Sequence, residues 1–145
     1  MARSILAVIA GYVVMALSIF LTLTCLYLLL GADASFRPGS YHPSTLWNAL
    51  SLLLGALSAV AGGYACATLA RGGRAPLALA ALVLLLGLLI NIPLAVAADD
   101  NAARPTNVPN MEAMMKAKQP GWMLLLNPFL GVACVLAGAR LARKD

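Results

Sequence analysis

Three methionines lie close together in a polar stretch of the chain, at Met111, Met114 and Met115. Thioether sulfur is a soft ligand that suits copper(I), and this spacing would place the three side chains on one face of a short helix. The same pattern is typical of a short helix that lies on a membrane surface with its methionines against lipid. The sequence favours lipid contact, so we expect no metal, and copper(I) is the less favoured alternative.

Three asparagines, Asn48, Asn91 and Asn127, form a second candidate site because they lie at similar depths in three apolar segments. Pro93 and Pro128 stand close to two of them. A proline inside a helix frees a backbone carbonyl, which a neighbouring amide can satisfy, and this structural role is the favoured interpretation. The alternative is an outer polar layer that forms a vestibule for a small neutral solute or a lipid headgroup.

The apolar segments themselves contain no Asp, Glu, His, Lys or Arg. Proton relays, ion-coupled transporters and intramembrane hydrolases place such groups inside the bilayer, where they are costly and usually functional. The chain also lacks a His-Glu-x-x-His motif, a Gly-x-Ser-x-Gly motif and a phosphate-binding Gly-Lys-Thr motif. We therefore expect a protein that is not an enzyme, with no catalytic residues and no cofactor.

The elements that carry these residues are four long apolar segments. The chain is 62% hydrophobic and only 10% charged, which is typical of a membrane protein. A helix needs about 20 apolar residues to cross the hydrocarbon core of a bilayer, and each segment supplies them. The predicted fold is an all-α membrane protein, a single domain (1–145) with four transmembrane helices in an up-down-up-down bundle and a short outer interfacial helix at about 110–119. The four spans are 4–30, 44–70, 76–98 and 121–139.

The charges outside these spans differ between the two sides of the predicted bundle. One side carries six cations and one anion, a net charge of +5, whereas the other side sums to zero. The positive-inside rule then predicts that both termini are cytoplasmic, and we expect a multi-pass protein of the bacterial inner membrane. The basic side suits anionic lipid headgroups, and no nucleic-acid partner is expected. The basic side comprises Arg3, Arg71, Arg74, Arg140, Arg143 and Lys144, with Asp145.

The second half of the chain repeats the first weakly, at an offset of 72 residues. Residues 52–71 match residues 124–143 at ten of twenty positions, including a shared Leu-Ala-Arg ending. Each half would be one helical hairpin, so a duplication predicts two parallel repeats about an axis along the membrane normal.

A ridge of small residues follows one face of the second span at intervals of four. Helices in lipid associate through close approach of such residues, so this ridge is the predicted helix-packing interface. Packing within the bundle is the favoured interpretation, and a homo-oligomer contact is the alternative. The ridge consists of Ser51, Gly55, Ala59, Gly63 and Ala67.

The segment Gly62-Gly63-Tyr64-x-x-Ala-x-x-Ala70-Arg71, with the related ending Gly138-Ala-Arg-Leu-Ala-Arg143, resembles the small four-span bacterial membrane proteins of unassigned function. The resemblance covers most of the chain and is built on generic features. It implies the four-span fold and brings no catalytic residues.

Two functions fit the sequence. The favoured one is a non-catalytic structural or accessory subunit that docks onto other membrane protein subunits, or onto copies of itself, in contact with membrane lipids. The glycine ridge and the short loops favour it. The alternative is a small permease or channel unit for a neutral small solute, whose pore would be lined by the asparagine layer.

Overall fold

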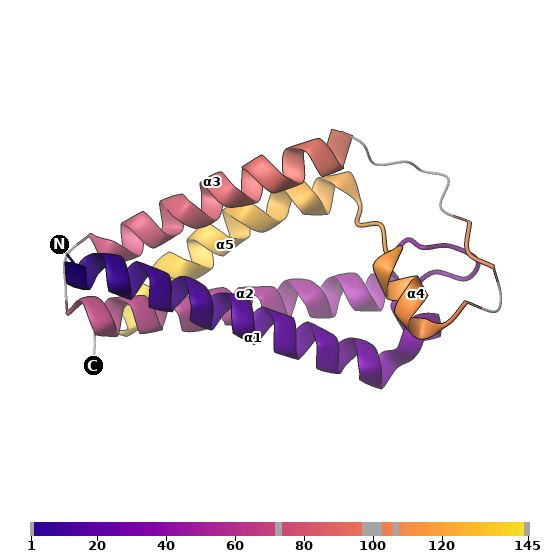
Figure 1. The fold of residues 1–145 in the computed structure, drawn as a ribbon, viewed down its shortest axis with the longest axis horizontal. Helices are drawn as coiled ribbons and strands as arrows, with labels where there is room; N and C mark the ends of the chain where they lie inside the picture. Colours follow the sequence, from indigo (N-terminus) through magenta and orange to yellow (C-terminus); the bar gives the residue numbers. More distant parts are fainter. Residues whose placement is uncertain (1, 72–73, 97–102, 106–107, 144–145) are drawn as a thin grey trace.

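The computed structural model describes residues 2–71, 74–96, 103–105 and 108–143. These residues form five helices and no strand. Four of the helices are long and apolar enough to cross a membrane, and they lie alongside one another with alternating direction (Figure 1). The predicted all-α four-helix bundle is therefore confirmed, as an integral membrane protein. The helices are α1 (Ala2–Ser35), α2 (Thr45–Ala70), α3 (Ala75–Val96), α4 (Asn110–Met115) and α5 (Gly121–Leu141).

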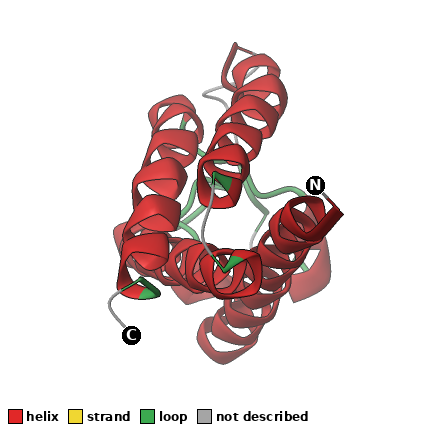
Figure 2. Ribbon diagram, turned by 90° about the vertical axis from the view of Figure 1, so that its left-hand side faces the viewer, coloured by secondary structure: helices red, strands yellow, loops and turns green. Residues whose placement is uncertain are grey.

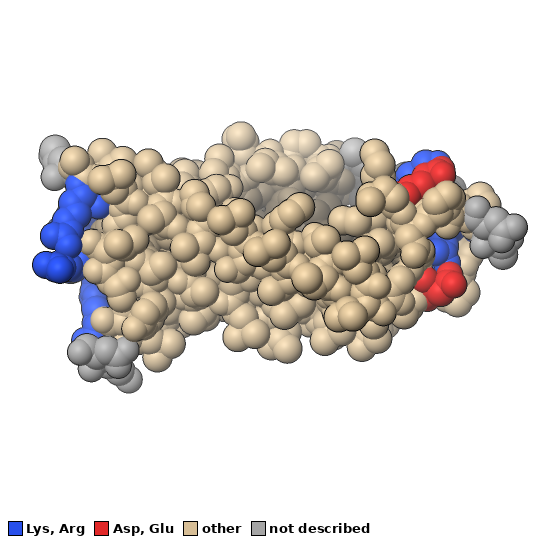
Figure 3. Space-filling view, turned by 60° about the horizontal axis from the view of Figure 1, so that its bottom comes forward, with Lys and Arg blue, Asp and Glu red and all other residues tan. Residues whose placement is uncertain are grey.

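The two ends of the bundle differ in their charged side chains (Figure 3). The terminal end is where α1 begins and α5 ends, and the cap end holds α4 (Figure 1). Basic side chains alone are seen at the terminal end, whereas acidic and basic ones are mixed at the cap end (Figure 3). Lys144, Asp145 and the acidic pair Asp99 and Asp100 lie outside the described residues.

The observed helix ends differ in detail from the expected ones. The first helix continues to Ser35 instead of Leu30, although Gly31 (φ 68°, ψ 177°) interrupts its regular geometry. The helix α2 begins after Ser44, whose hydroxyl accepts the Trp47 N–H at 3.1 Å and so caps the first turn. The third helix is described as far as Val96, and the expected final positions 97–98 lie outside the described residues.

The four long helices pack as two hairpins joined along one seam. In the described part of the chain α1 packs on α2, α3 packs on α5, and α2 packs on α5 along the seam, whereas the backbones of α1 and α5 do not approach each other closely. An end-on view shows the resulting order α1, α2, α5, α3 around the bundle (Figure 2).

The seam between the hairpins is closest where α2 crosses α5. A Cβ atom added to Gly63 would overlap the backbone of Val135, and one added to Gly138 would overlap the backbone of Val60. Positions 63 and 135 are 72 residues apart (135 − 63 = 72), which is the offset of the sequence repeat. The two halves therefore meet at equivalent positions, as two parallel repeats should.

The hairpins stay close at the terminal end and diverge toward the cap end (Figure 1). A cluster of buried apolar side chains from all four long helices packs around the crossing. A Cβ added to Gly11 would lie 2.7 Å from the Cβ atom of Cys66, so α1 and α2 also approach most closely in this region. The cluster comprises Ala7, Ala59, Cys66, Ala75, Leu79, Ala80 and Val135.

An aromatic cluster fixes the cap end. Tyr27 lies edge-on to Trp47 and to Phe36, with ring centroids 5.9 Å and 6.3 Å away. Its hydroxyl donates a hydrogen bond of 2.5 Å to the backbone carbonyl of Asn110, the first residue of α4. Arg104 lies over the Phe36 ring, 5.7 Å from its centroid. Through these contacts α1 holds both connections in place above the bundle.

Replacement of Tyr27 with Phe should loosen α4 without disturbing the bundle. The change leaves the Asn110 carbonyl without its donor, at a cost of about 1–2 kcal/mol confined to the cap. Hydrogen exchange should be faster at residues 110–116 and unchanged at the α2–α5 crossing. Tyr12→Phe, a tyrosine far from α4 on the same helix, is the matched control. Equal exchange at residues 110–116 in both variants would show that the Tyr27 hydroxyl does not anchor α4.

Candidate functional site

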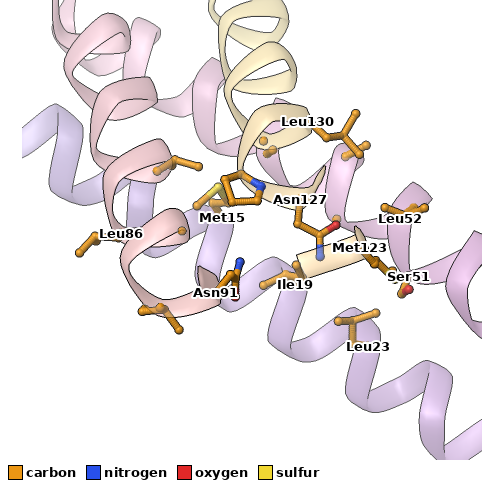
Figure 4. A pocket seen from close by; sticks show the side chains of 18 of the residues that line it. Met15, Ile19, Leu23, Ser51, Leu52, Leu86, Asn91, Met123, Asn127 and Leu130 are labelled. Atoms are coloured by element: carbon orange, nitrogen blue, oxygen red, sulfur yellow. The ribbon is translucent and has the colours of Figure 1, made fainter. Parts of the chain in front are cut away.

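The divergence of the hairpins leaves a cavity of about 310 Å³ lined by all four long helices. Its walls are mostly apolar, with Met15, Ile19 and Leu23 from α1 and Leu86 from α3 (Figure 4). A volume of this size is at the lower end of the range for small-molecule sites in proteins. The cavity is lined by side chains from both hairpins, so a molecule bound there would contact both of them.

The cavity opens sideways. Among the described residues the backbones of α1 and α3 have few close approaches and those of α1 and α5 have none, so the hairpins are most loosely packed on the side between α1 and α3. The flank of the molecule is hollowed on this side (Figure 3). The terminal end of the cavity is closed by the buried cluster around the crossing. In a bilayer, this opening would face the lipid chains.

A second cavity of about 370 Å³ adjoins the first toward the cap end. The two share Ile19, Leu23 and Gln119 in their walls. The second is lined in addition by the aromatic rings of Tyr27, Phe36 and Trp47 beneath α4. The two cavities therefore lie side by side between the middle of the bundle and the cap.

Two asparagines of the predicted outer polar layer meet at the first cavity. Asn91 of α3 and Asn127 of α5 both line it, and their side chains point into the same space (Figure 4). No hydrogen bond joins either amide to another described residue. The role favoured from sequence was to satisfy backbone carbonyls freed by the prolines, and no such hydrogen bond is present among the described residues. Each amide can both donate and accept, and both capacities are open toward the cavity.

The third member of that layer, Asn48, lies elsewhere. It does not line the cavity, and its Oδ1 atom is buried without a hydrogen-bond partner among the described residues. Its backbone carbonyl accepts a hydrogen bond of 3.1 Å from the hydroxyl of Ser51. Similar depth in the membrane therefore does not bring all three asparagines together, because they lie on different faces of their helices.

The small-residue ridge of α2 faces the interior of the monomer. Gly63 packs on Val135, and Ser51, Ala59 and Ala67 are buried. Gly55 lines the cavity, where an added Cβ would lie 3.6 Å from Ile19. One part of the ridge thus packs against α5 and another part forms the floor of the cavity.

Sequence reasoning missed several residues of the cavity. Pro128, which suggested a kink, packs into the space left by Gly87, where a Cβ would lie 2.8 Å from the proline ring. Gln119 borders both cavities just before α5 begins. The polar character of Gln119 is visible in the sequence, but only the path of the chain after α4 brings it to the cavity.

The helix α4 is shorter than expected. It ends at Met115 rather than near residue 119 because the chain turns away, and the Lys118 N–H donates to the carbonyl of Tyr41 at 3.2 Å. Glu112 accepts a 2.7 Å hydrogen bond from Lys116 and thereby raises the pKa of that amine.

The three methionines of α4, which the sequence offered as possible copper(I) ligands, lie in two different environments. Met111 and Met115 are 67% and 83% exposed. Met114 instead lines the second cavity. Among the described residues no group of three or more His, Cys, Asp or Glu side chains could hold a metal ion. The arrangement favours contact of Met111 and Met115 with a lipid surface or a partner.

The lining of the first cavity determines what it could bind. Its described polar side chains are amides and hydroxyls, with no carboxylate, lysine, arginine or histidine among them. A charged ligand would be buried there without a counter-ion, which is costly. A mostly apolar molecule with one uncharged hydroxyl, carbonyl or ester group would place that group against Asn91 and Asn127. Searches of family models, curated proteins and solved structures find no match to this chain.

Proposed function

We propose that this protein is a non-catalytic permease unit that binds a neutral, largely apolar molecule in the cavity between its two hairpins. The observation that carries the proposal is the pair of amides, Asn91 and Asn127, which line a laterally open cavity and have no hydrogen-bond partner among the described residues. Polar groups inside a membrane are normally satisfied by the protein, and the missing partner points to a ligand. The lateral opening suits a molecule that enters from the lipid.

The same geometry lowers support for docking through the glycine ridge. The ridge was one of the features that favoured an accessory subunit, together with the short loops and the lack of active-site residues. In the structure Gly63 of the ridge packs on Val135, and the neighbouring Gly62 packs on Gly11, so this part of α2 is used in packing within the chain. The cavity between the hairpins, by contrast, is accessible to a molecule from outside the chain.

The proposed location follows from the charges. We place the protein in the bacterial inner membrane with both termini cytoplasmic, because the terminal end carries the excess of arginines. The cavity then lies toward the outer leaflet and is closed on the cytoplasmic side. Transport would require the two hairpins to rock about their crossing, as repeats do in larger transporters.

Photolabelling tests this proposal. The probe is a photoreactive, clickable monoacylglycerol, which is neutral and has one acyl chain, and its charged counterpart is photoreactive lysophosphatidylglycerol. With the protein in nanodiscs, we expect the neutral probe to label cavity-lining peptides of α1, α3 and α5 in preference to the charged one. The double variant Asn91→Leu, Asn127→Leu should reduce this labelling about tenfold, because two hydrogen bonds in lipid are lost.

The matched control for the double variant is Asn48→Leu, which makes the same change at an asparagine outside the cavity. It should leave the labelling as it is in the wild-type protein. Labelling spread evenly over the lipid-facing surfaces of the helices, or labelling unaffected by the double variant, would argue against the cavity as a binding site.

An accessory subunit remains the second candidate, favoured by the exposed methionines of α4. Met111 and Met115 are largely exposed at the cap end, where they could contact a partner protein. Co-purification of a fixed set of other subunits after gentle extraction, lost on replacement of both methionines with Ser, would support this role. A chain that purifies alone would favour the permease.

A further inference from the structure

A second recess lies at the terminal end of the bundle, away from the cavity between the hairpins. Its volume is about 420 Å³, and it shares no lining residue with either cavity described above. Tyr64, Thr68 and Arg71 line it from α2 and its last turn, Pro76 lines it from the start of α3, and Arg143 lines it after the end of α5.

The two arginines of this recess are related by the sequence repeat. Arg71 and Arg143 are 72 residues apart (143 − 71 = 72), and both follow helices that take part in the crossing, Arg71 at the next position after α2 and Arg143 two positions after the end of α5. Because α2 and α5 run in the same direction and cross at Gly63 and Val135, their ends come together at one point of the surface. The crossing that holds the hairpins together therefore also places two guanidinium groups at one recess.

The surroundings of the recess are strongly basic. Every charged side chain described at the terminal end is an arginine, since Asp33 and Glu112 lie at the cap end (Figure 3). Arg3 is engaged with the end of α2, where its Nε donates to the carbonyl of Leu69 at 3.0 Å. Arginines gathered in this way attract anions to this end of the bundle.

The chemistry of the lining selects the kind of anion. Arginine presents parallel N–H donors that match the oxygens of a phosphate group. The Thr68 hydroxyl donates to the carbonyl of Ala65 at 2.9 Å, and the two arginines are the cationic donors of the lining. The recess opens where the apolar helix surfaces end, which is the level of lipid headgroups in a bilayer.

We propose that Arg71 and Arg143 form a binding site for a phosphate group, and that the phosphate is that of an anionic membrane phospholipid. Free inorganic phosphate is the other source of the same chemistry. The site is independent of the proposed permease function, since it uses different residues at the opposite end of the bundle. A lipid held there would bridge the ends of the two hairpins next to their crossing.

Native mass spectrometry of the whole chain tests the site. The protein is exchanged into detergent with equal amounts of phosphatidylglycerol and phosphatidylethanolamine, and the retained lipids are counted. We expect the wild-type protein to retain phosphatidylglycerol preferentially, and the double variant Arg71→Gln, Arg143→Gln to retain about tenfold less. The matched control is Arg74→Gln, Arg140→Gln, which removes the same charge at the same end outside the recess, and it should reduce retention less than twofold.

Two further results complete the test. An equal loss in both double variants would overturn the proposal, because it would show a general effect of charge, and so would full retention in the recess variant. Displacement of phosphatidylglycerol by excess inorganic phosphate would overturn the assignment to a lipid in favour of free phosphate. Unchanged monoacylglycerol labelling of the recess variant would show that its fold is intact and that the two sites are separate.

Discussion

A Gly63→Leu variant is expected to lose the folded bundle. The new side chain would overlap the backbone of Val135, which cannot move aside as a side chain can, where α2 crosses α5. Overpacking of side chains alone costs about 1–3 kcal/mol, and a clash with backbone at the seam should cost more. Size-exclusion chromatography and thermal melting in a mild detergent should show aggregated protein or a strongly lowered Tm.

The control for this variant is Ala61→Leu, which adds a leucine to the exposed face of the same helix. It should melt like the wild-type protein, because its side chain would point toward lipid. Equal stability of Gly63→Leu and Ala61→Leu would show that the hairpins do not meet at this glycine. The position of the cavity, which depends on that crossing, would then be wrong as well.

A Gly55→Leu variant is expected to keep the fold and lose the ligand. An added Cβ at this position makes only ordinary contact with Ile19, so the backbone need not move, and the rest of the leucine would occupy the cavity. We expect monoacylglycerol labelling of the cavity peptides to fall about tenfold or more, the effect of losing at least 1.4 kcal/mol of binding free energy. Circular dichroism and the Tm should stay close to those of the wild-type protein.

Ala61→Leu again provides the control, because it adds the same side chain one and a half turns away on the lipid-facing surface. It should label as the wild-type protein does. If Gly55→Leu folds normally and its cavity peptides are labelled as strongly as before, then the molecule that reaches these peptides does not occupy the cavity.

The fold could be predicted from the sequence because the bilayer constrains it strongly. Long segments without charge must be helices that satisfy their own backbone groups in lipid, and short connections make neighbours antiparallel. These features depend on composition and chain length, which a sequence states directly. The repeat offset does not state where the halves meet, and the structure supplies the crossing at Gly63 and Val135.

The cavity could not be predicted because it depends on how far the hairpins diverge. The ridge of small residues indicates that α2 packs closely on something, but it does not say that Gly63 meets α5 whereas Gly55 borders empty space. The three asparagines were predicted to lie together because they have similar depths in the membrane. The rotation of each helix about its axis brings Asn91 and Asn127 to the same cavity and leaves Asn48 outside it. Rotation and crossing angle follow from contacts among all four helices.

The structure of the cap end could likewise be predicted only in part from the sequence. The turn around Gly39, with its φ of 66°, follows from glycine and proline content. The hydrogen bond between Tyr27 and Asn110 joins residues 83 positions apart and has no local signal. The early end of α4 arises from the contact of Lys118 with Tyr41, which only the assembled cap provides.

Native mass spectrometry of protein extracted directly into copolymer nanodiscs, without detergent, tests the proposed function most directly. We expect a single chain that carries one neutral adduct with the mass of a small lipid or similar apolar molecule, and we expect Gly55→Leu to lack that adduct. A stable assembly with unrelated subunits and no such adduct, or the same adduct retained in full by Gly55→Leu, would contradict a ligand held between the hairpins.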